Sequence, residues 1–159
     1  MEENQLISEI YKYNNGKFEF YSDLMGKLNT GDSCKNIPPI FAKEVINDTV
    51  FLTTGFLYTT ADMKDFTMMS TPSYARTYDI YKYDSKLYFV TASKTKDDIY
   101  KIIIYSTKGE ANDFKIEKSF ESSMHPTSLA VNEDYYFISL GNWWNDGDEN
   151  NGKIIQVVR

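Results

Sequence analysis

The sequence predicts an all-β fold, and three observations point to it. Aromatic residues make up 16% of the 159 residues, and thirteen of them are Tyr, which together with many Ile, Val and Thr residues favours strands. Alanine is scarce, and no long block of helix-favouring residues occurs. The third observation is a phrase that recurs three times, in which a turn residue leads into a short apolar and aromatic run.

The recurring phrase defines a repeated unit. It reads NDTVFLTTG from Asn47, DSKLYFVTAS from Asp84 and NEDYYFISLG from Asn132. Residues two positions apart share one face of a strand, and the pairs with this spacing are Phe51 and Thr53, Leu87 and Phe89, and Tyr136 and Ile138. Each copy follows one short segment and precedes another, and two copies have a further segment after that. The unit is therefore four short strands joined by turns.

The strands can be assigned in order along the chain. The first segment, ISEIYKYNNGKFEFYS, carries the tight-turn signal Asn-Asn-Gly between two strand-like runs. Leu6, Ile7, Ile10 and Tyr11 also fit a helical stripe, but the segment parallels the third and fourth strands of a unit, so we interpret it as a hairpin. In a later unit, IYKIIIYS is apolar on both faces, which suits a strand buried between two sheets.

A repeat of about 40 to 50 residues with four strands predicts the blades of a β-propeller, and a β-sandwich is the alternative. We expect one all-β unit of about three blades, with a partial blade at 1–36, blades at 37–72 and 73–122, and a partial blade at 123–159. A closed propeller needs roughly four to eight blades. We therefore expect the chain to be part of a larger propeller or to be completed by another chain, for example in a homo-oligomer.

The charge and the cysteine content exclude several classes of function. The net charge of −6 argues against binding to nucleic acid or to an anionic membrane. No apolar stretch approaches the roughly 18 residues that span a bilayer, and the acidic first residues do not resemble a signal peptide. The cell compartment stays undetermined. Cys34 is the single cysteine, so neither an internal disulfide nor a cysteine-based zinc cluster can form.

Two short segments resemble known propeller families. FLYTTADMKDF, with YSTKGEANDF as a looser copy, resembles glycoside hydrolases of the arabinanase, xylosidase and sialidase type. HPTSLAVNEDYYFISLGN with GKIIQVVR resembles the last blade of NHL or gluconolactonase-like propellers, so the subfamily stays open. The hydrolase resemblance implies carboxylates near the central axis that act as acid and base, for which Glu44 and Asp79 are candidates. Asp62 and Asp84 also occur, but turn formation explains them better.

Two further residues are candidates for ligand binding. His125 is the only histidine, and it precedes a segment that a propeller places beside its central channel. It could bind a ligand or help to hold a metal, or it could form a His-Pro corner in which the ring bonds to the backbone. Arg76 lies beside Tyr74 and Tyr78 and could pair with an anionic ligand group, or it could be a solvated surface side chain.

The loop GNWWNDGDENNGK is longer than the two to five residues of a hairpin turn, which makes it a candidate binding surface. An exposed Trp143 or Trp144 flanked by the amides of Asn142 and Asn145 could stack on a sugar ring, although both rings could also pack between blades. The candidate calcium ligands follow the Asp-x-Asp-x-Asn spacing and are Asp146, Asp148 and Asn150. The same residue types also form ordinary solvated turns.

These features favour a non-catalytic ligand-binding or scaffold segment of a propeller, with a glycan as the expected partner and calcium as a candidate ion. The alternative is a fragment of a glycan-active hydrolase with carboxylates on the axis. The two hypotheses differ in the separation of the carboxylates, because a hydrolase needs two of them about 5 to 9.5 Å apart in one pocket.

Overall fold

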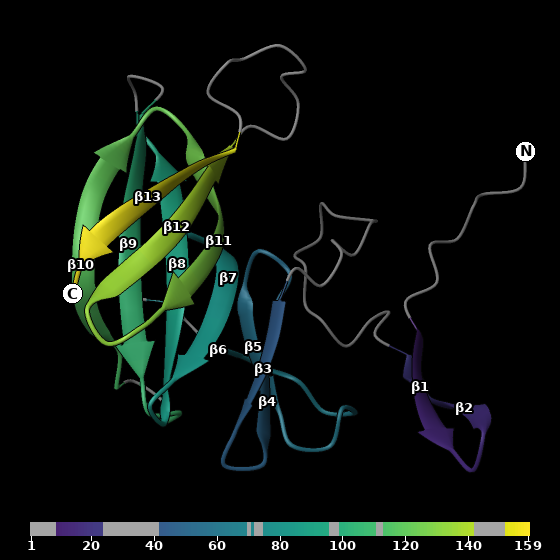
Figure 1. Cartoon of the computed structure of the whole chain (residues 1–159). Coiled ribbons are helices and arrows are strands. Elements are labelled where there is room, and N and C mark those ends of the chain that lie inside the picture. Colours follow the sequence, from purple (N-terminus) through teal and green to yellow (C-terminus); the bar gives the residue numbers. More distant parts are fainter. Residues whose placement is uncertain are drawn as a thin grey trace, which may run out of the picture.

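The computed structural model describes residues 9–23, 42–69, 71, 75–95, 99–110, 113–141 and 152–159. Within these ranges the chain forms strands and no helix, and the strands make four antiparallel sheets of two, four, four and three strands (Figure 1). This confirms the predicted fold class of repeated four-stranded blades in a partial propeller. No helix in these ranges is long and apolar enough to cross a membrane.

Two of the sheets are complete four-stranded meanders, in which each strand pairs with the next one along the chain. The first consists of β3 (Ala42–Ile46), β4 (Thr49–Thr53), β5 (Leu57–Thr60) and β6 (Thr67–Met69). The second consists of β7 (Arg76–Tyr83), β8 (Lys86–Lys94), β9 (Tyr100–Thr107) and β10 (Lys115–Ser122).

Smaller sheets lie on either side of these two. The first is the hairpin of β1 (Glu9–Asn14) and β2 (Lys17–Asp23), which confirms the strand interpretation of this segment over the helical one. The last is the three-stranded sheet of β11 (His125–Val131), β12 (Tyr135–Gly141) and β13 (Lys153–Val158). The blade boundaries, and completion by a longer or a second chain, stay predictions.

The repeated phrase begins at a tight turn in each complete blade. Asn47 and Asp48 have φ of 48° and 60°, and Asp84 and Ser85 have φ of 48° and 58°. Two consecutive residues with positive φ are the signature of the type I′ turn, whose twist matches that of the flanking strands. In the last sheet the side chain of Asn132 stabilises the turn. Its oxygen accepts the backbone N–H groups of Asp134 at 3.0 Å and of Tyr135 at 2.8 Å.

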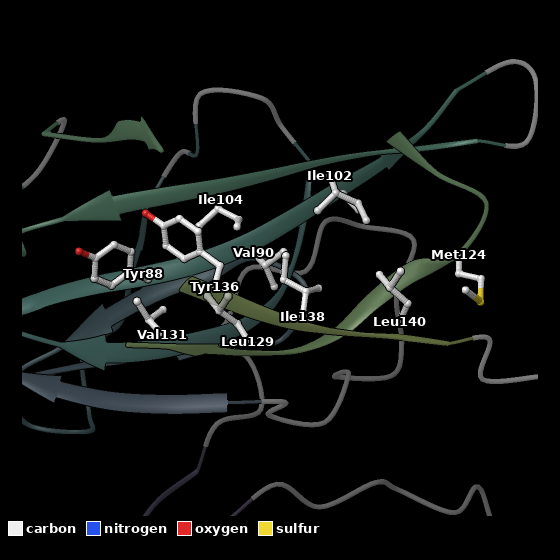
Figure 2. Packing of buried hydrophobic residues seen from close by; sticks show 11 residues of the cluster. Tyr88, Val90, Ile102, Ile104, Met124, Leu129, Val131, Tyr136, Ile138 and Leu140 are labelled. Carbon is white, nitrogen blue, oxygen red and sulfur yellow. The ribbon is translucent and has the colours of Figure 1, made fainter. Parts of the chain in front are cut away.

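The core lies between sheets that pack face to face. On one side of β8 and β9, Tyr88, Val90, Ile102 and Ile104 pack against side chains of β11 and β12, as Figure 2 shows. On the other side, the alternate residues Phe89, Ile103 and Tyr105 pack against the sheet of β3 to β6. All six residues from Ile102 to Thr107 are buried, so β9 is covered on both faces as its sequence predicts.

The first strands of successive sheets lie beside one another, since β7 contacts both β3 and β11. Hydrogen bonds link these neighbours. The hydroxyl of Thr53 donates to the carbonyl of Thr77 at 2.9 Å, and the Thr77 amide donates to the carbonyl of Gly55 at 2.9 Å. Further along, the Lys82 ammonium donates to the carbonyl of Val45 at 2.9 Å. These bonds join β7 to the sheet of β3 to β6.

Candidate functional site

The predicted site residues within the described ranges lie on the first strands of successive sheets. Glu44 is on β3, Arg76 and Asp79 are on β7, and His125 begins β11. The other predicted residues lie outside the described residues; they are Asn142, Trp143, Trp144, Asn145, Asp146, Asp148 and Asn150. Stacking on the tryptophans and binding of calcium therefore stay predictions. Among the side chains that are placed, no three His, Cys, Asp or Glu residues are grouped as metal ligands would be.

His125 is buried at the beginning of β11 and contacts two tyrosine rings. Tyr78 of β7 stacks on the imidazole, with centroids 5.2 Å apart and an angle of 20° between the planes. Tyr100 of β9 meets the same ring edge-on, at 5.7 Å and 72°. The imidazole Nδ1 lies 3.0 Å from the carbonyl oxygen of Pro126, so it donates this hydrogen bond, as the His-Pro corner interpretation predicts. The sequence did not indicate the two aromatic neighbours.

Arg76 extends this group of side chains to the surface. Its guanidinium carbon lies 5.3 Å from the centroid of the Tyr78 ring, within the range of a cation–π interaction, and the residue is exposed. The arginine side chain passes over Gly55, where a Cβ atom would come within 3.5 Å of the arginine Nε. We call Arg76, Tyr78, Tyr100 and His125 the histidine cluster. It combines a fixed charge, two phenol groups and an imidazole.

Two β-bulges shape the histidine cluster. The pairing of β7 with β8 shifts at Tyr78, and the pairing of β11 with β12 shifts at Thr127. On a regular strand Tyr78 and Ile80 would face the same way, because they are two positions apart. Here Tyr78 packs toward β11 while Ile80 packs toward β3. A bulge re-aims a side chain in this way, and it turns Tyr78 toward His125.

The histidine cluster lies at the end of the sheets where the long loop begins. His125 pairs with Gly141, the last residue of β12, and Tyr100 pairs with Lys94 at the end of β8. In the sequence, Trp143 follows Gly141 by two positions. The loop predicted to bind a ligand therefore starts from the residue that is paired with His125.

Asp79 joins β7 to β11. Its Oδ2 accepts the amide N–H of Leu129 at 2.7 Å, and its Oδ1 accepts the amide N–H of Ile80 at 2.8 Å. Burial raises the pKa of the Asp79 carboxyl, the two amides act in the lowering direction, and the charge of Glu44 raises this pKa further. Because its Oδ2 accepts the amide of Leu129 on β11, Asp79 links two sheets.

The two carboxyl groups of the hydrolase alternative have different surroundings. Glu44 lines a groove of about 440 Å³ together with Lys43, Val45, Val50, Met63 and Lys82, and Asp79 is not among the lining residues. A second hollow, of about 330 Å³, lies by Asp62 and Asp65. Asp62 accepts the amides of Lys64 and Asp65 at 2.8 and 3.0 Å, which is the turn-forming role expected from the sequence.

Comparisons with known proteins support the fold and go no further. No family model matches the chain, and no curated protein matches it. Among solved structures, the chain is similar to a crystal structure of glucose dehydrogenase, with a TM-score of 0.52 and 14% sequence identity. The match covers 76% of this chain and 44% of that one, so the chain spans less than half the length of the similar protein. This likeness supports a β-propeller-like fold without assigning a subfamily.

Proposed function

We propose that the chain is a non-catalytic, carbohydrate-binding segment of a β-propeller, with its binding surface at the histidine cluster. The observation that supports this most directly is the stack of His125, Tyr78 and the Arg76 guanidinium at the surface. The stack holds the guanidinium in one place, so little side-chain freedom is lost when a ligand binds. An ordered guanidinium donates hydrogen bonds to sugar hydroxyls and binds a sugar carboxylate more strongly.

The adjacent loop supports the same proposal. It carries both tryptophans of the chain, and it begins at the residue paired with His125. Aromatic rings bind the apolar faces of sugar rings, and Asn142 and Asn145 supply amide groups for hydroxyls. The name of the similar structure also refers to glucose, which is in keeping with a sugar ligand.

The hydrolase alternative depends on Glu44 and Asp79, and the charge of Glu44 acts to raise the pKa of Asp79. Asp79 already binds two backbone amides, and it does not line the groove beside Glu44. We therefore expect no release of reducing sugar from arabinan or from aryl glycosides. Hydrolysis that disappears in Glu44→Gln and Asp79→Asn would reverse the order of the two proposals.

Fluorescence titration tests the binding proposal. Because Trp143 and Trp144 are the only tryptophans, the tryptophan emission, excited selectively over that of the tyrosines, reports on this loop alone. We expect glucose or glucuronate to change the emission in a saturable manner, with glucuronate binding more tightly if the guanidinium takes a carboxylate. Arg76→Ala should weaken binding about tenfold or more, because a hydrogen bond to a charged group contributes about 1.5–3 kcal/mol. Lys108→Ala, at an exposed cation away from the histidine cluster, is the control.

Emission that does not respond to neutral or acidic monosaccharides or to their oligomers would refute the sugar-binding proposal. Equal loss of affinity in the Arg76 and Lys108 variants would show that binding depends on general charge and not on the histidine cluster.

A further inference from the structure

The β1–β2 hairpin presents an aromatic face to solvent. Tyr11 lies opposite Phe20 and Tyr13 lies opposite Phe18, so the four rings share one face of the hairpin. The centroids of the two pairs are 6.1 and 5.1 Å apart, and the four side chains are between 50% and 73% exposed. We call these four residues the hairpin face.

The opposite side of the hairpin packs on the neighbouring blade. Ile10, which pairs with Ser22 beyond a shift in the pairing at Tyr11, packs against Leu52 and Tyr58. The Ser22 hydroxyl donates to a carbonyl oxygen of the β5–β6 turn at 2.7 Å. The hairpin face thus points away from the β3–β6 sheet, and Figure 1 shows the hairpin beyond that sheet, on the side away from β7 to β13.

The three-stranded sheet carries an apolar face at the other end of the series. Tyr136 and Ile138 of β12 point into the core against β8 and β9, so the alternate residues Tyr135 and Phe137 point away. On β13, Val158 pairs with Tyr135 and Ile154 pairs with Ser139, so both β13 side chains point away from the core as well. Ile154 is 71% exposed and Val158 is 66% exposed. We call Tyr135, Phe137, Ile154 and Val158 the β12–β13 face.

We infer that these two faces bind each other between two copies of the chain. The hairpin face of one copy packs on the β12–β13 face of the second, and the reciprocal contact closes a ring of two chains. The chain already joins its own sheets twice by packing apolar faces together, on either side of β8 and β9, and the new contact continues that arrangement. The two faces lie at opposite ends of the same series of sheets. Two head-to-tail contacts, one in each direction, therefore bury both faces of both copies.

The length of the similar propeller agrees with this arrangement. The matched 76% of the chain covers 44% of the glucose dehydrogenase chain, so the matched parts of two copies correspond to most of one such chain. Closure would also protect the edges and end faces, which are a liability in an open arc. This inference does not depend on the sugar-binding proposal, because none of its residues belongs to the histidine cluster.

Light scattering coupled to size exclusion, with sedimentation velocity over a range of concentrations, tests the inference. The full chain is expected to have twice the 18.5 kDa mass of one copy. Phe18→Lys and Ile154→Lys, on the two faces, should each give a monomer. Ile116→Lys is the matched control, because Ile116 is an exposed apolar side chain, at 57%, on β10 and outside both faces. Circular dichroism should show that all three variants are folded.

A mixing experiment identifies which face meets which. A head-to-tail contact predicts that Phe18→Lys and Ile154→Lys chains, each monomeric alone, form a one-to-one complex when mixed, because one intact junction remains. If only one of the two substitutions dissociates the dimer, the substituted face binds the same face of the second copy, and the head-to-tail pairing is wrong. A monomeric wild type at high micromolar concentration, or open-ended assembly, would overturn the closed pair.

Discussion

Replacing Asp79 tests whether the link between two blades depends on a single carboxylate. In Asp79→Ala the amides of Leu129 and Ile80, both on residues that are 4% exposed, lose their acceptor. A buried amide without a partner costs about 1–3 kcal/mol, and relief of a partly buried charge offsets some of that. We therefore expect the free energy of unfolding to fall by roughly 2–3 kcal/mol.

Urea denaturation followed by circular dichroism measures this change. Asp79→Asn keeps one oxygen acceptor and should lose less, on the order of 1 kcal/mol. Asp134→Ala removes a carboxylate of the same type from the exposed turn between β11 and β12 and serves as the control. Equal stability of the Asp79→Ala variant and the control would refute the assignment of Asp79 as the link between sheets.

The dependence of the free energy of unfolding on pH tests whether burial is the cause of the raised pKa of Asp79. Burial raises the pKa of Asp79 in the folded state, so the folded protein binds this proton more tightly than the unfolded chain does. The resulting stability is fully present below the ordinary pKa of aspartate and is lost as the pH rises through the raised value. The stability difference between wild type and Asp79→Asn should therefore shrink as the pH rises across that window. A difference that grows would show that the amides outweigh burial.

Three other predictions concern the core, the turns and the long loop. Ile104→Ala should lower the free energy of unfolding by about 2–5 kcal/mol, because the side chain is fully buried, whereas the exposed Ile116→Ala should change it by less than about 0.5 kcal/mol in urea denaturation. Ser85→Gly should raise the free energy of unfolding by roughly 0.5–1 kcal/mol, because φ is 58° at this position and glycine adopts positive φ without strain. A loss of stability in this variant would contradict the turn assignment. If Asp146 and Asp148 hold calcium, EDTA should lower the melting midpoint, and an unchanged midpoint would exclude the ion.

The fold was predictable because its signals are local. Turn chemistry at Asn47, Asp84 and Asn132 marks where hairpins begin, and each of these turns has the backbone or side-chain geometry that its sequence implies. Strand periodicity then assigns the faces, as it does for the strand that contains Ile104. Each signal depends on residues a few positions apart, so a single sequence contains it.

The site was only partly predictable, for the opposite reason. Composition indicated His125 and Arg76 as candidates, but their shared neighbour Tyr78 depends on a bulge, and nothing in the local sequence marks that bulge. The hydrogen bond from Leu129 to Asp79 joins residues 50 positions apart. Whether two strands from different blades meet at these residues depends on the packing of whole sheets, which local patterns do not contain.

Two consecutive residues of β7 connect the geometry of the histidine cluster to the packing of the blades. Tyr78 and Asp79 are consecutive on β7, and one contacts His125 while the other accepts the Leu129 amide on the same strand β11. The amide link fixes the position of β11 along β7, and that position determines whether the Tyr78 and His125 rings can stack. A shift of one residue between these strands would move them by about 3.3 Å relative to each other, which would break the link and separate the rings. The structure therefore positions the histidine cluster through the contact between two blades, and neither blade alone contains all of its residues.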